Sequence, residues 1–256
     1  MSPEAFAHLP HLREKMVAPG ESRLRVTPEV LKSWDERARQ IGRPADWRIS
    51  DAEREQNRRA VLGQRDPGSD PGNDLWIYAY GSLMWDPGFH FAEVRLARLT
   101  GYARRFSYRT VIGRGSPEHP GLMLTLEETG GDCCCTGLAF RIPAAQAEAE
   151  STILWRREMV RGGYRPIQVQ VATPQGAVSA VVFACNHDHP DYVGELTLAQ
   201  TAATIARGTG MNGSNRQYLE QLAEQLAHLG LEDQDMTRLL QEVRTCGGAG
   251  VTDELP

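Results

Sequence analysis

Five strand-like segments follow one another between residues 75 and 142, with no helical segment between them. They are rich in β-branched and aromatic residues, and glycine and proline punctuate the block, which is typical of β-strands. The segments are residues 75–80, 93–101, 105–112, 122–126 and 134–141. Because strands and helices do not alternate here, this order excludes a parallel sheet of strand–helix–strand units, and with it a dinucleotide-binding domain of that type.

Helical patterns follow the central strands. Residues 143–160 are rich in alanine and glutamate and predict a helix, and strands are expected over residues 164–172 and 178–185. Three further helices are expected over residues 197–207, 214–229 and 232–246. The whole pattern predicts an α+β protein whose central strands build a sheet or a small barrel.

The first 74 residues predict a helical extension and a linker. Thr27-Pro28-Glu29 is typical of a helix start, because threonine caps the first turn and proline fits its first position. Gly42 ends that helix, a second charged helix is expected over residues 51–62, and two Pro-Gly pairs mark residues 64–73 as a linker. We therefore predict an extension with its linker over residues 1–74, a main domain over residues 75–246 and a tail over residues 247–256.

The charge balance favours a small-molecule partner. Lysine and arginine number 28 against 33 acidic residues, a net charge of -5 at pH 7, so nucleic acid and anionic membranes are not expected partners. No stretch has the apolar length of a membrane-spanning helix. Because the N-terminus lacks the apolar core of a secretory signal, we expect a cytoplasmic protein.

Neither the cysteines nor the histidines predict a metal site. Cys133, Cys134 and Cys135 are consecutive, so on a strand they point to alternating faces and do not converge on one ion. The odd total of five cysteines, without CxxC spacing, favours reduced thiols. His187 and His189 lie in a proline-containing loop without an obvious third ligand, which favours solvated histidines.

The run L-W-I-Y-A-Y breaks at Gly81-Ser82, and two interpretations are open. The chain either turns a corner there, or presents bare backbone N–H groups and a hydroxyl to a ligand at the end of the strand. A serine-hydrolase nucleophile is not expected, because Ser82 lies in Y-G-S-L and not in G-x-S-x-G.

Glu158 is the first candidate for chemistry. Leu154 and Trp155 precede it by four and three residues, so the three side chains share one apolar helix face. The alternative is a glutamate at the rim of that face, paired with Arg157 or Arg161. Partial burial and the carboxyl end of the helix would raise the pKa of Glu158, whereas neighbouring arginines would lower it. A glutamate with a raised pKa suits proton transfer.

Tyr218 is the second candidate. It lies on an expected helix after the glycine-rich residues 208–213 and is either a core tyrosine or a ligand contact. Because this loop lacks the G-K-[ST] ending of a P-loop, nucleotide binding is not favoured.

Six ordered motifs carry a resemblance between residue 76 and about residue 246. They are Y-G-S-L-M-W at 80–85, G-Y-A-R-R-F at 101–106, P-G-L-M-L-T-L at 120–126, R-E-M with G-G-Y at 157–164, H-P-D-Y at 189–192 and N-x-x-Y-L at 215–219. Together they resemble the ChaC-type γ-glutamylcyclotransferases, the glutathione-degrading branch of that superfamily. Six motifs in order are far more specific than one.

The resemblance implies a mixed barrel-like α+β fold with flanking helices, no cofactor and no metal. It also implies a lyase that cleaves glutathione to 5-oxoproline and cysteinylglycine. The family's loop for the γ-glutamyl group matches Tyr80, Gly81, Ser82 and Leu83. Its acid/base glutamate matches Glu158 and its substrate-contacting tyrosine matches Tyr218. On this basis the corner-turn interpretation of Gly81-Ser82 is the weaker one.

Two alternatives stay open. One is a cyclotransferase for other γ-glutamyl peptides or amines, which would use the same chemistry. The other is a non-catalytic regulatory binding protein related to cation transport. Glu158 separates the second from an enzyme, because a binding module has no need of a basic carboxylate on an apolar helix face.

Overall fold

A computed structural model describes residues 1–64 and 73–246 of the chain. Most of the predicted linker over residues 64–73, and all of the predicted tail over residues 247–256, lie outside the described residues. The chain forms two compact units. Unit 1 comprises Met1–Ala103 and Leu126–Asn186, and unit 2 comprises Arg104–Thr125 and His187–Pro256.

A closed barrel of five strands forms the centre of unit 1. Around the barrel the order is β1 (Leu75–Ala79), β5 (Cys134–Ile142), β2 (Glu93–Thr100), β6 (Tyr164–Thr173) and β7 (Gly176–Cys185). The barrel closes through a parallel pairing of β1 with β7, in which Ile77 lies opposite Val181. Apolar side chains of these strands, such as Ile77 and Phe140, are fully buried, so burial of the strand residues holds the barrel together.

Gly137 permits a close approach between two barrel strands. A Cβ atom at this position would lie 2.1 Å from the carbonyl oxygen of Ala79, so only glycine fits beside the end of β1. On the same two strands, the buried Tyr78 hydroxyl donates a hydrogen bond to the Cys135 carbonyl over 2.8 Å. These contacts hold the end of β1, where the Y-G-S-L loop begins.

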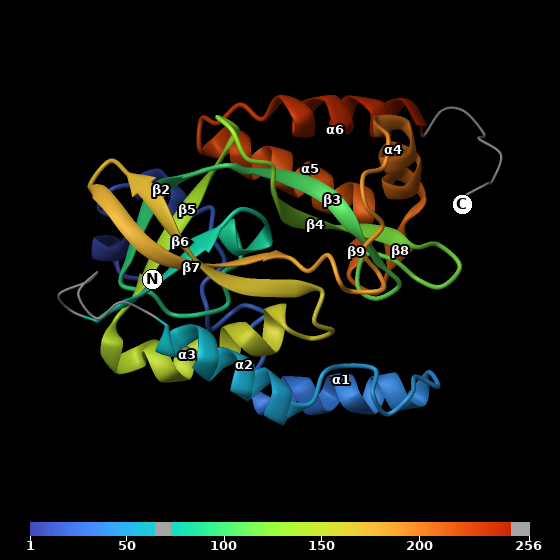
Figure 1. Ribbon diagram of the computed structural model, residues 1–256, viewed down its shortest axis with the longest axis horizontal. Helices are drawn as coiled ribbons and strands as arrows, with labels where there is room; N and C mark the ends of the chain where they lie inside the picture. Colours follow the sequence, from blue (N-terminus) through green and yellow to red (C-terminus); the bar gives the residue numbers. More distant parts are fainter. Residues whose placement is uncertain (65–72, 247–256) are drawn as a thin grey trace. The chain divides into compact units, whose positions relative to one another are not determined.

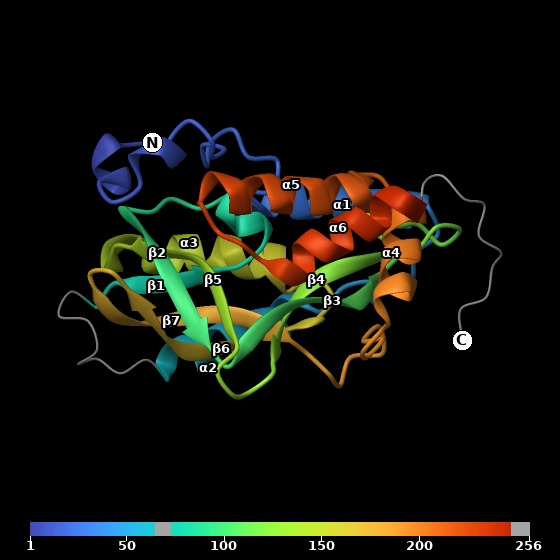
Figure 2. The same ribbon diagram turned by 90° about the horizontal axis from the view of Figure 1, so that it is seen from above.

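The helices of unit 1 begin with the caps expected from the sequence. Helix α1 (Pro28–Gln40) is capped by the Thr27 side chain, and α2 (Asp51–Gly63) by a capping box of Ser50 and Glu53. Helix α3 (Ala144–Glu158) lies beside α2 (Figures 1 and 2). The described residues of unit 1 also form three short 3-10 helices, which are η1 (Pro3–Phe6), η2 (Pro10–Leu12) and η3 (Ser82–Met84).

Unit 2 combines helices with parts of two long strands. Strands β3 (Tyr102–Thr110) and β4 (Gly121–Glu128) pair with each other. The other elements are α4 (Leu198–Arg207), β8 (Thr209–Gly210), β9 (Gly213–Ser214), α5 (Asn215–His228) and α6 (Gln234–Cys246). The side chain of Asn215 joins α5 to β4, because it accepts from the Leu122 amide over 2.7 Å and donates to the Leu122 carbonyl over 2.8 Å.

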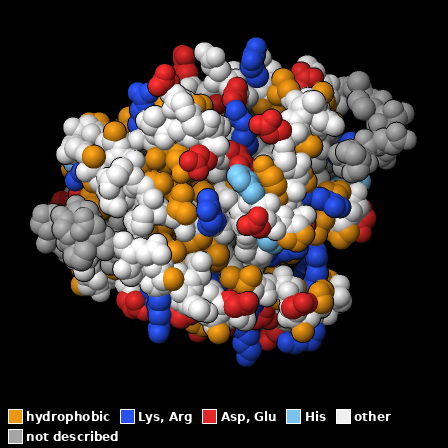
Figure 3. All heavy atoms as spheres, viewed as in Figure 1, with side chains coloured by type: hydrophobic (Ala, Val, Ile, Leu, Met, Phe, Trp, Pro, Cys, Tyr) orange, Lys and Arg blue, Asp and Glu red, His pale blue; other side chains and the backbone are white. Residues whose placement is uncertain are grey.

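The predicted α+β class and barrel are confirmed. Each predicted strand and helix of the main domain is present with ends within three residues, the largest difference being β3, which begins at Tyr102. The 3-10 helices and the short pair β8–β9 were not predicted. Among the described residues, no helix is both long and apolar enough to cross a membrane. Acidic, basic and apolar side chains all occur on the face drawn in Figure 3.

Candidate active site

The Y-G-S-L loop leaves the barrel at the end of β1. Tyr80 is buried, and its hydroxyl donates a hydrogen bond to the Phe183 carbonyl on β7 over 2.7 Å. After Gly81 the chain enters η3, in which the amide of Met84 donates to the Gly81 carbonyl and that of Trp85 to the Ser82 carbonyl. Tyr80 therefore anchors the loop to β7, and its hydroxyl already donates a hydrogen bond within the protein.

Three consecutive backbone amides of this loop are unpaired in the described part of the chain. The N–H groups of Gly81, Ser82 and Leu83 have no hydrogen-bond acceptor among the residues that the structure describes. The first turn of any helix leaves such groups unpaired, and unpaired amides can bind a carboxylate or a developing oxyanion.

Helix α3 places Glu158 at its last position. Leu154 and Trp155 are 1% exposed, and the Glu158 side chain on the same face is 14% exposed, as the predicted apolar face requires. The Trp155 ring packs edge-on against Phe183 with centroids 4.9 Å apart, and its Nε1 donates to the Asn57 Oδ1 on α2 over 2.9 Å. These contacts fix the end of α3 against the barrel.

Burial raises the pKa of Glu158 above the ordinary glutamate value, and the Arg157 guanidinium opposes the rise. Arg157 Nε lies 3.0 Å from Glu158 Oε1. The sequence left open which influence prevails, and in the structure burial prevails. Glu158 therefore combines a raised pKa with a charged neighbour, Arg157, that orients one oxygen of its carboxylate.

Arg157 is the residue whose importance the sequence analysis missed. Its side chain is 7% exposed, and besides Glu158 it contacts the Y-G-S-L segment and the residues after it. The Nη2 group donates to the Ser82 Oγ over 3.0 Å, and the Nη1 group donates to the Asp86 carbonyl over 2.5 Å. One guanidinium thus joins the carboxylate of α3 to the loop. The sequence identified it only as a neighbour of Glu158.

Tyr218 belongs to unit 2, on α5. It is half-buried, its ring packs edge-on against Phe106 with centroids 6.1 Å apart, and the Arg114 guanidinium lies 5.9 Å from the ring centre. The structure therefore brings Glu158 together with the Y-G-S-L loop, through Arg157, within unit 1. A role for Tyr218 at that loop stays a prediction.

The expectation of solvated histidines holds for His187, which is exposed, and is wrong for His189. The His189 side chain is 13% exposed, its ring lies 5.2 Å from that of Tyr108, and its Nδ1 accepts a hydrogen bond from the Asp191 amide over 3.1 Å.

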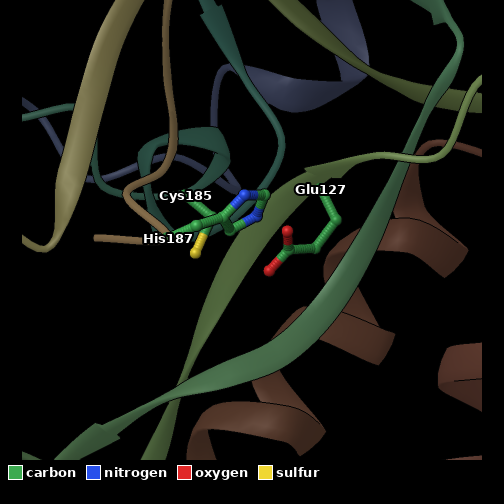
Figure 4. Close-up of side chains that lie close together, drawn as sticks. All are labelled: Glu127, Cys185 and His187. Carbon is green, nitrogen blue, oxygen red and sulfur yellow. The ribbon is translucent and has the colours of Figure 1, made fainter. Parts of the chain in front are cut away.

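The five cysteines are free, and on β5 the half-buried Cys134 precedes the buried Cys135, as alternation of faces requires. Figure 4 draws three side chains of types that bind metals: Glu127 and Cys185, which belong to unit 1, and His187, the first residue of unit 2. Because they are divided between the two units, no metal site is assigned to them.

A polar cavity of about 220 Å³ lies between α2 and α3. Its lining residues are Asp51, Arg54, Glu55, Arg58, Thr152, Trp155 and Arg156. None of the predicted site residues lines it, and its walls are mostly charged side chains already paired with one another, such as Arg58 with Glu55. This cavity is therefore not the candidate active site.

Comparison with known proteins gives a family and close relatives. The model of the ChaC-like protein family matches residues 75–246. A glutathione-specific γ-glutamylcyclotransferase of Escherichia coli K12 is 40% identical over 171 residues, which cover 66% of this chain and 73% of that protein. The glutathione-specific γ-glutamylcyclotransferase 1 of Homo sapiens is 32% identical over 173 residues, covering 64% and 78%.

The fold is also similar to that of a solved enzyme. The crystal structure of a γ-glutamyl cyclotransferase specific to glutathione from yeast superimposes with a TM-score of 0.62 at 25% identity. The superposition covers 68% of this chain and 97% of the yeast chain.

Proposed function

Since the chain belongs to the ChaC-like protein family, we propose that it is a glutathione-specific γ-glutamylcyclotransferase that releases 5-oxoproline and cysteinylglycine. The family match agrees with the resemblance seen in the sequence motifs. The observation that carries the proposed mechanism is the guanidinium of Arg157, which contacts both the Glu158 carboxylate and the Ser82 hydroxyl. It supports a single site formed by the Y-G-S-L loop and the end of α3. We propose residues 75–246 as the catalytic domain, with residues 1–74 as an extension and residues 247–256 as a tail.

The reaction is an intramolecular aminolysis. The α-nitrogen of the glutamyl group forms a bond to its own side-chain carbonyl carbon, and the bond from that carbon to the cysteinyl nitrogen breaks. The lactam nitrogen keeps one of the three protons of the attacking ammonium, so two are lost: one is transferred to the leaving nitrogen, which departs as an amine, and the other is taken up by solvent or by that amine. No water is consumed. Because the nucleophile is tethered, correct folding of the substrate can supply up to about 7–11 kcal/mol of the barrier.

Glu158 carries the proton in this proposal. An α-ammonium group is mostly protonated at neutral pH and must lose a proton before it can attack. A glutamate with a raised pKa accepts that proton and returns it to the leaving nitrogen. Arg157 opposes the rise in the pKa and orients the carboxylate, which favours the ionised form that acts as a base.

The loop amides bind the substrate's oxygens. The N–H groups of Gly81, Ser82 and Leu83 can donate to the γ-glutamyl α-carboxylate, or to the carbonyl oxygen as it gains charge. Tyr80 keeps the loop attached to β7 through Phe183. Tyr218 is also proposed to contact the substrate, as the family resemblance implies. No metal or other cofactor takes part in this scheme.

Glutathione is the proposed partner, and the cytoplasm the proposed location. The net charge of -5 disfavours binding to nucleic acid or to anionic membranes. The five free cysteines suit a reducing compartment, where glutathione is available as the reduced thiol.

The proposal is tested by incubating the purified full-length protein with reduced glutathione, without added metal or nucleotide. We expect 5-oxoproline and cysteinylglycine in equal amounts from the wild type. If glutathione gives no product but another γ-glutamyl peptide or amine does, the substrate assignment is wrong, while the proposed intramolecular aminolysis is retained. Failure with every γ-glutamyl compound would favour the non-catalytic alternative.

A further inference from the structure

A segment of the N-terminal extension contacts the chain directly after the Y-G-S-L loop. This segment, Val17 to Arg25, lies outside the residues that the family model matches, and we name it the N-terminal brace. The amide of Val17 donates to the Trp85 carbonyl over 2.8 Å, and the Ser22 hydroxyl donates to the Asp86 carboxylate over 2.5 Å. All of these residues belong to unit 1.

Arg25 makes the strongest contacts of the brace. Its guanidinium forms a bidentate pair with Glu150 on α3, at 2.6 and 2.9 Å, and also donates to the Gly88 carbonyl over 3.0 Å. The Glu150 carboxylate in turn accepts from the amide of His90 over 3.0 Å. The Glu150 side chain is 7% exposed, and bidentate pairs shielded from water are among the strongest and most directional ion pairs. Arg25 thus ties the chain at Gly88 and His90 to α3.

Asp86 and Gly88 are held from two sides. Asp86 accepts from Ser22 through its carboxylate and from Arg157 through its carbonyl. At Gly88, where φ is +68°, a Cβ atom would lie 3.1 Å from the Leu24 carbonyl oxygen and 3.2 Å from Arg157 Nη1. The chain after the loop therefore passes between the brace and the arginine that contacts Glu158.

Helix α3 connects these contacts to the chemistry. Glu150 lies eight residues before Glu158 on the same helix, so both carboxylates move with α3 as one rigid element. Arg157 holds the loop near the end of α3, and the pair of Arg25 with Glu150 holds the following residues near its middle. The position of the Gly81–Leu83 amides relative to Glu158 depends on both attachments.

We propose that Ser22 and Arg25 are positioning residues, which fix the Y-G-S-L loop relative to α3 for the reaction. This inference rests on the proposed function. It predicts that loss of the brace contacts loosens residues 81–90 and lowers kcat/KM, because displacing a reacting group by about 1 Å can cost up to about 100-fold in rate. If the brace were only a stabilising surface, its loss would lower the melting temperature without a selective effect on the loop.

Arg58 provides a matched control. It also lies in the extension and also forms a bidentate pair with a glutamate of α3, Glu148. Its remaining hydrogen bonds go to Glu55 on α2 and Ser151 on α3. The Arg58 side chain is 2% exposed and the Arg25 side chain 22% exposed. Truncation of Arg58 to alanine should therefore lower the stability at least as much as truncation of Arg25.

The experiment compares Arg25→Ala, Ser22→Ala and Arg58→Ala with the wild type, all as full-length proteins. Hydrogen exchange followed by mass spectrometry reports the order of residues 81–90 relative to the barrel strands, and kinetics with glutathione report kcat/KM. We expect Arg25→Ala to speed exchange in residues 81–90 selectively and to lower kcat/KM by about 10- to 100-fold. Ser22→Ala should have smaller effects in the same direction. Arg58→Ala should neither speed exchange in residues 81–90 selectively nor lower kcat/KM.

Equal effects of Arg25→Ala and Arg58→Ala on the loop and on kcat/KM would overturn the proposal, as would unchanged loop exchange in Arg25→Ala. If Arg25→Ala does not fold, Ser22→Ala decides by the same two readouts, since it removes only one hydroxyl. An inactive wild type would refute the proposed function, while the exchange measurements would still test the bracing of the loop.

Discussion

Replacing Arg157 by methionine removes the guanidinium that joins Glu158 to the Y-G-S-L loop. The substitution keeps most of the aliphatic stem but deletes the charge and the donors to Ser82 and Asp86. Glu158 then keeps its burial and loses the cation 3.0 Å away. Because burial raises the pKa of Glu158 and Arg157 lowers it, the substitution should raise this pKa further.

The cost in stability follows from the exposure of the pair. The Arg157 and Glu158 side chains are 7% and 14% exposed, so they form a largely buried ion pair. Removing one member of such a pair costs about 3–5 kcal/mol. Protonation of Glu158 removes part of this cost. We therefore expect the substitution to lower the free energy of unfolding by about 3 kcal/mol, and the melting temperature by about 6–12 °C for a protein of this size.

The assay is kcat/KM for glutathione as a function of pH, at a temperature where each variant is folded. Ionised Glu158 is needed as the base, so the acid limb of the profile should move to higher pH in Arg157→Met, and kcat/KM at neutral pH should fall about 10- to 100-fold. Arg156→Met is the control, since Arg156 is the preceding arginine of the same helix. An acid limb that does not move, or that moves equally in Arg156→Met, would refute the reasoning.

Three further predictions follow from individual contacts. Glu158→Gln should remove a pH dependence of stability, because the pKa of Glu158 is raised in the native state. As the pH rises from the ordinary glutamate pKa through the native value, the wild type should lose stability relative to the variant. Denaturation measured at several pH values would refute the raised pKa if it showed the opposite slope. Tyr218→Phe should weaken glutathione binding or turnover with little change in melting temperature, whereas a large drop in melting temperature would favour a core role. Gly137→Ala should destabilise the barrel by several kcal/mol or prevent folding, because its Cβ would meet the Ala79 carbonyl at 2.1 Å, and a melting temperature equal to the wild type would contradict that geometry.

The features that the sequence predicted well are local. Thr27 and Pro28 mark the start of α1 because capping involves neighbouring residues, and Leu154, Trp155 and Glu158 share a face because helical periodicity places them there. The order of strand-like and helical segments along the chain predicted the α+β class from local patterns in the same way. The break at Gly81 coincides with the start of η3, whose first amides are unpaired as a helix start requires.

The features that could not be predicted from the sequence depend on residues far apart in the chain. Arg157 contacts Ser82 across 75 positions, and Arg25 contacts Glu150 across 125 positions. No local periodicity or cap encodes such pairs, because they form only when the barrel has brought α3 and the loop together. The parallel closure of β1 against β7 is another example, since short-range patterns do not reveal which strands become neighbours.

The most direct test of the central claim measures the products of reduced glutathione with the wild type and with Glu158→Gln. The account predicts that the wild type forms 5-oxoproline and cysteinylglycine in equal amounts without glutamate, because the attack is intramolecular. It predicts that Glu158→Gln, folded and still able to bind glutathione, loses about 100-fold or more of this turnover. Full turnover by Glu158→Gln, or glutamate as the main product of the wild type, would contradict it.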